Sequence, residues 1–273
     1  MKKILCTTDF SDAALSGISY AAKLAKRIDA DLTLFNVVAL TDLFPEEVLM
    51  GEEVNKRAAK GRLETQSAEV SKVFKISCYG EVVTTPTSVS QAIASKASGY
   101  DLTVMGTNGA DDVKQFFLGS HTYRAIRSAT IPVLMVPEKT VYSDPEHVVY
   151  AYDHWRNDHL PLNQLISFLR LISCTKLTVL QVMEESVSER ANEEQRRLEQ
   201  VVSKLYRDDV DMTFETIHNA DVADGINSYM KKANADILAL CSEHHGFLSS
   251  LFHKSVIKSV ASVANFPVMV FHA

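Results

Sequence analysis

Short apolar runs alternate with longer stretches in which apolar residues recur every three or four positions. The runs Lys3–Thr7 and Asp31–Val38 are mostly apolar, which is typical of strands buried on both faces of a sheet. Between them Ala14, Ile18 and Ala21 are spaced as one stripe of a helix. The pattern therefore predicts a strand–helix–strand unit, and the same alternation continues along the chain.

The whole chain divides into two sets of predicted elements. The expected strands are Lys3–Thr7, Asp31–Val38, Val73–Tyr79, Leu102–Met105 and Val133–Val136, then His147–Tyr152, Lys176–Val182, Asp211–Ile217, Ile237–Leu240 and Val268–Phe271. Helices are expected after Asp9 and Ser11, from Pro45, from Thr85-Pro86 and from Ser120, then from Leu160, Glu189, Asp221 and Ser255. The alternation predicts an α/β fold with parallel strands, helices on both faces and right-handed crossovers.

The second set repeats the first at a constant offset. Asp101 and Asp236 each open a strand, Pro132 and Pro267 each precede one, and both pairs are separated by 135 positions. A polar stretch bounded by prolines, residues 137–145, lies between the sets. We therefore expect two domains, 1–139 and 146–273, each large enough to bury its own core.

The two copies differ in their glycines. After its fourth strand the first copy carries Gly106, Gly109 and Gly119, followed by Ser120. The corresponding positions of the second copy are Cys241, His244, Lys254 and Ser255. Glycine allows backbone N–H groups to approach a ligand phosphate closely because it has no Cβ. The sequence thus predicts one intact ligand site, in the first copy, and a lost or altered site in the second.

These residues resemble the universal stress protein family. The start of the chain, residues 4–11, resembles the first strand of that family and the acidic residue after it. The spacing of the three glycines and the following serine is similar to the nucleotide-binding signature of the family, and Ile131-Pro132-Val133 resembles the start of its last strand. Because both copies are covered, the chain is identified as a tandem, two-domain member.

The resemblance implies a particular architecture. Each copy would be an open, twisted, five-stranded parallel sheet in the strand order 3-2-1-4-5. The copies would pack as an intrachain pseudo-dimer through Val133–Val136 and Val268–Phe271, and two chains could associate as a homodimer. In such a sheet the order reverses between the first and fourth strands, which is where ligands of open α/β sheets bind.

The resemblance also implies an adenine nucleotide, ATP or AMP, at that point of the first copy. The side nearest adenine and ribose would be lined by Thr7, Thr8, Asp9, Val37, Met105 and Gly106. The phosphates would lie against Thr107, Gly109, Gly119, Ser120, His121 and Thr122, at a helix N-terminus that favours anions. The second copy has Asp153 in place of Asp9 and Val182 near the place of Val37, but no nucleotide is expected there.

Two carboxylates complicate the predicted phosphate loop. Asp111 and Asp112 follow Gly109 and would repel a polyphosphate unless a divalent cation lay between them. AMP, or ATP with Mg²⁺, is then favoured over ATP alone. The simpler interpretation, that these are solvated loop charges, is the preferred one, and no metal ligand is assigned.

Other features have plain structural interpretations beside their functional ones. The glycines could be turn formers and Asp9 could be a helix cap. His244, His245 and His253 suggest zinc, but their spacing matches no standard site, so surface imidazoles are favoured. No P-loop, nucleophile elbow or zinc-protease motif is present, so no catalytic residue is assigned.

Composition and charge disfavour some classes of binding partner. The net charge of −6 disfavours a nucleic-acid partner, and no apolar run approaches the roughly 20 residues that span a bilayer. The apolar start ends at once in Thr7-Thr8-Asp9, unlike a signal peptide. The four cysteines lie far apart, which indicates reduced thiols and a cytoplasmic protein.

We therefore expect a cytoplasmic stress-response protein that binds an adenine nucleotide in its first domain as a regulatory switch. An unidentified protein partner would read the switch. Two alternatives stay open: a nucleotide-independent protein-interaction scaffold, and a weak, metal-dependent ATPase with slow turnover.

Overall fold

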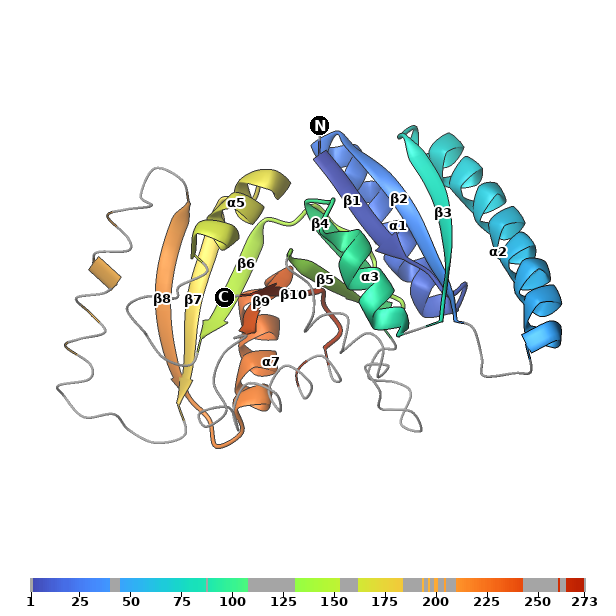
Figure 1. Cartoon of the computed structure of the whole chain (residues 1–273). Helices are drawn as coiled ribbons and strands as arrows, with labels where there is room; N and C mark the ends of the chain where they lie inside the picture. Colours follow the sequence, from blue (N-terminus) through green and yellow to red (C-terminus); the bar gives the residue numbers. More distant parts are fainter. Residues whose placement is uncertain are drawn as a thin grey trace. The chain divides into compact units, whose positions relative to one another are not determined.

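The computed structural model of the chain describes residues 2–39, 45–86, 88–107, 131–152, 162–183, 210–242 and 264–272, with residues 193, 196, 199, 200, 204 and 260. The chain forms two compact units, Met1–Tyr142 and Ser143–Ala273 (Figure 1). The described residues of each unit contain five parallel strands.

The first unit is a five-stranded sheet with helices packed on it. Its strands are β1 (Lys2–Thr7), β2 (Ala30–Ala39), β3 (Cys78–Thr85), β4 (Leu102–Thr107) and β5 (Val133–Pro137), and its described helices are α1 (Asp12–Ile28), α2 (Pro45–Phe74) and α3 (Val89–Ala97). The strands are parallel and follow the order β3-β2-β1-β4-β5. The predicted order 3-2-1-4-5 is confirmed.

The second unit repeats this arrangement. Its strands are β6 (His147–Tyr152), β7 (Lys176–Met183), β8 (Asp211–His218), β9 (Ile237–Ser242) and β10 (Val268–His272), with described helices α5 (Leu162–Ile172) and α7 (Val222–Ala233). The order is β8-β7-β6-β9-β10, again with parallel pairing. The predicted duplication of one α/β sheet is therefore confirmed.

Helices cover both faces of each sheet. In the first unit α1 and α3 lie on opposite sides of the strands (Figure 1). In the second unit Phe168 of α5 packs edge-to-face on Phe271 of β10, with ring centroids 6.0 Å apart. Gly225 of α7 lies against Val182 of β7, whose side chain points to the other face of the sheet. Both sheets are thus buried on two sides, which explains their apolar strands.

Helix α1 begins and ends with ordinary capping. The Ser11 hydroxyl accepts a hydrogen bond from Ala14 N at 3.2 Å, as an N-cap does. At the other end Asp29 adopts a left-handed conformation with φ 53° and donates its N–H to the carbonyl of Ala25. The predicted helix start near Ser11 is confirmed.

The predicted third strand was wrong. The segment Val73–Tyr79 was expected to be a strand, but α2 continues to Phe74 and β3 begins at Cys78. The helix buries Leu63, Ser67 and Val70 at helical spacing, whereas Val73 is 62% exposed. Strand pairing with β2 begins only where Cys78 lies opposite Leu32.

The helix predicted from Thr85-Pro86 also begins later than expected. Thr85 pairs with Ala39 as the last residue of β3. The helix, α3, begins at Val89 after Ser88. Proline at position 86 therefore ends a strand rather than starting a helix, a place that its missing N–H also permits.

An aspartate at equivalent positions of the two units forms hydrogen bonds with the start of the neighbouring strand. Asp101 Oδ2 accepts a hydrogen bond from Lys3 N at 2.7 Å, and Asp236 Oδ2 accepts one from His147 N at 3.0 Å. The N–H groups of the two aspartates donate in return to the carbonyls of Lys3 and His147. The 135-residue offset therefore reflects a shared structural role, which is to fix the start of β1 and of β6.

Helix α1 and strand β4 approach each other very closely in the first unit. A Cβ atom built on Gly106 would stand 1.9 Å from the carbonyl oxygen of Ala13. A Cβ built on Gly17 would stand 2.8 Å from the backbone nitrogen of Gly106. Real Cβ atoms do not approach other atoms so closely, so both positions require glycine.

We predict that Gly106→Ala destabilises the protein even without ligand. The new methyl group would force α1 away from β4, at a cost of about 1–3 kcal/mol or more in the free energy of unfolding. Urea unfolding followed by circular dichroism measures this. Gly61→Ala in α2 is the control, because a Cβ there meets nothing within 4 Å; equal stability of the two variants would contradict the proposed contact.

A buried histidine lies at the start of the second sheet. His147 is 5% exposed, and its Nε2 lies 2.9 Å from Thr178 Oγ1, which in turn lies 3.0 Å from Thr213 Oγ1. Burial, reinforced by the nearby charge of Lys176, lowers the pKa of His147 below its ordinary value of 6.5; the backbone of Ala233 and the carboxylate of Asp236 oppose this shift only in part. The folded chain therefore favours the neutral imidazole.

We therefore predict that the need to protonate His147 destabilises the folded chain at acidic pH. Below pH 6.5 the unfolded chain binds the proton more readily than the folded chain, so the free energy of unfolding falls as the pH decreases from about 7 to about 5. Chemical unfolding across this range measures the slope. His147→Gln should flatten it, whereas His218→Gln should not; an unchanged slope in the first variant would refute this account.

Candidate functional site

Three strands of the first sheet end side by side where the strand order reverses. Thr7 at the end of β1 stands opposite Phe35 of β2 on one side and Met105 of β4 on the other. Val37 lies two residues beyond Phe35 on the same strand. This switch point, formed by the carboxyl ends of β1, β2 and β4, is where open α/β sheets bind ligands.

The chain is held firmly as it leaves β1. Thr8 donates its N–H to the carbonyl of Phe35 at 2.9 Å, and its own carbonyl accepts a hydrogen bond from Asn36 Nδ2 at 2.7 Å. Both backbone polar groups of Thr8 are therefore fixed by β2. The position of the next residue, Asp9, follows from this anchoring.

A tight turn presents Asp9 to solvent. Its Oδ1 accepts the N–H of Ser11 at 3.0 Å, and Thr8 Oγ1 accepts the N–H of Phe10 at 3.0 Å. Phe10 has a positive φ of 66°, and the guanidinium of Arg62 lies 4.0 Å from the centre of its ring. Asp9 is exposed, so its carboxylate is available to a polar ligand while the turn itself is rigid.

Seven predicted ligand residues gather at the switch point. They are Thr7, Thr8, Asp9, Val37, Met105, Gly106 and Thr107. Three of these, Thr8, Met105 and Thr107, have buried side chains, so a ligand would meet mainly their backbone. The carbonyl of Thr107 already accepts the N–H of Glu138 at 2.7 Å. The other five, Gly109, Gly119, Ser120, His121 and Thr122, lie outside the described residues.

The packing of α1 on β4 requires glycine at position 106, a reason that the sequence alone did not reveal. Gly106 lies inside β4 rather than after it, and its missing Cβ admits the carbonyl of Ala13 from α1. The glycine is needed there with or without a ligand. Its contribution to a ligand site would be indirect, since it sets how closely α1 and the turn before it approach β4.

Sequence reasoning missed two residues of this region. Gly17 belongs to the α1–β4 contact, and its signal was a glycine among the alanines of a buried helix stripe. Asn36 anchors Thr8, and its signal was one amide within an otherwise apolar strand. Asn36 is 6% exposed and its Oδ1 has no hydrogen-bond partner among the described residues.

The cysteine near the switch point, Cys6, has a fully buried thiol. Burial raises the pKa of the Cys6 thiol far above its ordinary value, with a smaller contribution from Cys78, and burial also raises the pKa of Cys78 to about 12. None of the four cysteines forms a disulfide. In the described part of the chain no three His, Cys, Asp or Glu side chains gather as a metal ion would require.

The second unit has different side chains at the same register positions. Val182 corresponds to Val37, and Cys241 corresponds to Gly106. Tyr152 corresponds to Thr8, and its ring stacks with that of Tyr150 at 6.4 Å between centroids. Asp153 and the histidine-rich loop, residues 243–259, lie outside the described residues.

The helix of the second unit also packs differently. Where α1 presents Ala21 and Ala25 to the sheet, α5 presents Leu165 and Leu169. The loss of glycine at position 241 therefore accompanies larger buried side chains on the helix of the second unit.

Comparison with known proteins identifies the family. The model of the universal stress protein family matches residues 1–137 and 146–272. The chain belongs to the universal stress protein family. A universal stress protein of Methanocaldococcus jannaschii is 28% identical over 151 residues, which cover 50% of this chain and 81% of the relative.

Solved structures share the tandem fold. A universal stress protein of Archaeoglobus fulgidus matches with a TM-score of 0.77 and 18% identity, covering 99% of this chain and 98% of that one. A protein of unknown function from Pseudomonas aeruginosa PAO1 matches with a TM-score of 0.62 and 15% identity, covering 100% and 92%. At these identities the likeness concerns the fold alone. Within the described residues no helix has both the length and the apolar character to cross a bilayer.

We predict that Asn36 is needed to hold the turn at the switch point. Asn36→Leu would leave the buried carbonyl of Thr8 without its donor, and should lower the free energy of unfolding by about 1–3 kcal/mol. Urea unfolding measures the loss. Asn55→Leu is the control, since Asn55 is exposed on α2; equal effects of the two substitutions would argue against this role.

Proposed function

We propose that this universal stress protein binds an adenine nucleotide at the switch point of its first unit and acts as a regulatory switch in the cytoplasm. The observation that carries the proposal is the convergence of the Thr8-Asp9 turn with Met105–Thr107, from which the chain continues into the glycine motif. A backbone-lined site of this kind suits a ligand with a flat base and many polar atoms.

Asp9 provides the polar anchor in this proposal. One carboxylate oxygen, Oδ1, is occupied by the N–H of Ser11. The second oxygen accepts no hydrogen bond among the described residues, so it can accept from a ribose hydroxyl. Thr7 and Val37, each half-buried, would border the base, with the backbone of Val37 giving it hydrogen bonds without a charged side chain.

The phosphates would extend toward the glycine motif. Thr107 and Gly109 would begin the phosphate loop, and Gly119, Ser120, His121 and Thr122 would close it with backbone N–H groups at a helix N-terminus. AMP, or ATP accompanied by Mg²⁺, is the proposed ligand, because Asp111 and Asp112 in the same loop would repel an uncompensated triphosphate. Ordering of this loop on binding would provide the change that a protein partner reads.

The second unit is proposed to bind no nucleotide in this way. Its register positions carry Tyr152 and Cys241 in place of Thr8 and Gly106, and its motif glycines are replaced in the sequence. One nucleotide per chain is therefore the expected stoichiometry.

Mass spectrometry of small molecules released from freshly purified, denatured protein tests the proposal. The expected result is about one adenine nucleotide per chain, or saturable uptake of one ATP or AMP per chain by stripped protein. Gly119→Val should abolish both because a side chain would block the phosphate loop. Gly61→Val, which adds the same side chain to an open helix position, should not.

Three outcomes would count against parts of this assignment. Unchanged uptake by Gly119→Val would remove the motif from the site. Two nucleotides per chain would show that the second unit also binds. Absence of any nucleotide, together with no uptake of ATP or AMP with or without Mg²⁺, would favour the scaffold function.

A further inference from the structure

Arg62 brings a positive charge from α2 to the turn that follows β1. Its guanidinium lies over the ring of Phe10, 4.0 Å from the ring centre, and Phe10 comes directly after Asp9 in this turn (residues 8–11, the Asp9 turn). An aromatic face attracts a cation at this distance. Within the described part of the chain Arg62 forms no ion pair and no hydrogen bond, so no other charged group competes with the ring for its guanidinium.

Phe10 has a backbone conformation that its side chain disfavours. Its φ of 66° lies in the left-handed region, where the Cβ of a residue other than glycine crowds the neighbouring carbonyl. Residues in such conformations persist only where their surroundings hold them. One such restraint is the hydrogen bond from the N–H of Phe10 to Thr8 Oγ1, and the contact with Arg62 is another. The shape of the Asp9 turn therefore depends in part on a helix outside the turn.

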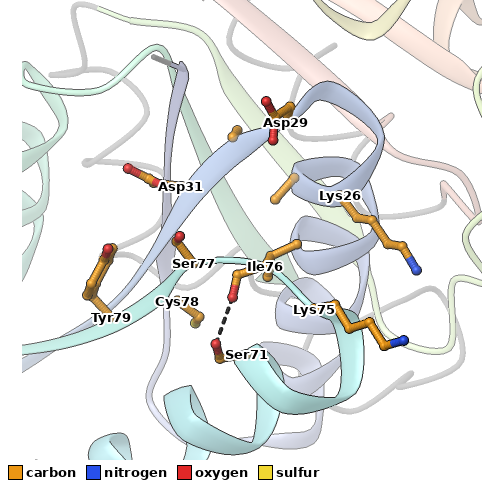
Figure 2. A pocket seen from close by; sticks show the side chains of 11 residues that line it. Lys26, Asp29, Asp31, Ser71, Lys75, Ile76, Ser77, Cys78 and Tyr79 are labelled. Atoms are coloured by element: carbon orange, nitrogen blue, oxygen red, sulfur yellow. Dashed lines mark hydrogen bonds between the residues drawn. The ribbon is translucent and has the colours of Figure 1, made fainter.

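Helix α2 is a firm support for this contact. Leu63, the neighbour of Arg62, is 1% exposed and packs on Gly80 of β3, where an added Cβ would stand 3.0 Å from Leu63 Cγ. Near the end of the helix Ser71 Oγ donates a hydrogen bond to the carbonyl of Ile76 at 2.7 Å, which fixes the connection into β3 (Figure 2). Arg62 thus extends from a part of α2 that the sheet holds in place.

We propose that Arg62 is a positioning residue of the nucleotide site, and this inference rests on the proposed function. Its contact with Phe10 keeps the Asp9 turn in the conformation that presents the carboxylate of Asp9. Without the contact a smaller fraction of chains has the binding conformation, and the apparent dissociation constant rises in proportion. Because coupling is reciprocal, a bound nucleotide also stabilises the contact, so α2 responds to occupancy of a site that it does not itself line.

A double-mutant cycle between positions 10 and 62 tests the contact. Arg62→Gln removes the cation, Phe10→Leu removes the aromatic ring and keeps an apolar side chain, and a third variant carries both substitutions. Isothermal titration calorimetry of the whole chain, stripped of nucleotide, gives the dissociation constants of AMP and of ATP with Mg²⁺. Each single substitution should weaken binding about threefold to fivefold, the effect of an exposed cation–π contact. The double variant should lose no more than the weaker-binding single variant, because both substitutions remove the same contact.

Two further variants separate stacking from charge. Arg57→Gln removes the same charge from another exposed position of α2, at which no described aromatic ring lies, and should bind as the unmodified chain does. Arg62→Lys keeps the charge but not the planar guanidinium, so it should restore the affinity only in part. Thermal unfolding of every variant measures the stability of the fold separately from the affinity.

A measurement without ligand reports on the turn itself. The N–H groups of Phe10 and Ser11 donate to Thr8 Oγ1 and Asp9 Oδ1 inside the turn, so their exchange with water is slowed while the turn is formed. In ¹H–¹⁵N spectra of the ligand-free chain these two amides should exchange at least about twofold faster in Arg62→Gln, and at the unmodified rate in Arg57→Gln.

The outcomes distinguish failure of this inference from failure of the proposed function. If the unmodified chain binds neither AMP nor ATP, the proposed function is wrong and the inference fails with it. If the unmodified chain binds but Arg62→Gln has the same affinity or the same amide exchange, only the inference is overturned. Losses that multiply in the double variant, or an equal loss in Arg57→Gln, would likewise overturn it. A lower melting temperature with unchanged affinity would reduce Arg62 to a purely structural residue.

Discussion

The close approach of α1 to β4 is the contact on which the rest of the first unit depends. Gly106 and Gly17 have no side chains where helix and strand meet, so the carbonyl of Ala13 can lie against the backbone of β4. This sets the height of α1 above the sheet. It also sets the position of the turn before the helix, in which Asp9 is presented. A candidate ligand site and a core contact thus share one glycine.

The described part of the second unit carries different side chains at the corresponding positions. Tyr150 and Tyr152 occupy the positions of Cys6 and Thr8, and leucines of α5 replace alanines of α1. Cys241 stands at the position of Gly106, so the second unit has a side chain where the first has none. The duplicated fold has therefore kept its topology while its two helix–sheet interfaces diverged.

The two ends of the first sheet offer different chemistry for a common reason. At the carboxyl ends of the strands helices begin, and their free N–H groups favour phosphates. At the amino ends helices finish, and their carbonyls favour cations, to which Asp29 and Asp31 add negative charge. That end of the sheet, where Lys26 and Lys75 also lie, is thus chemically unlike the switch point. One small sheet presents two separate environments without any insertion.

Local patterns were enough to predict the tandem α/β fold, the strand order through the family resemblance, and the residues near the switch point. They succeeded because periodicity, helix caps and the 135-residue offset can all be recognised from the order of residues along the chain. They failed for β3, whose start depends on the register of Cys78 with Leu32. They also gave no structural reason for Gly106, and they missed the roles of Asn36 and Gly17. Those roles arise only when segments far apart in sequence come into contact, so the tertiary structure alone decides them.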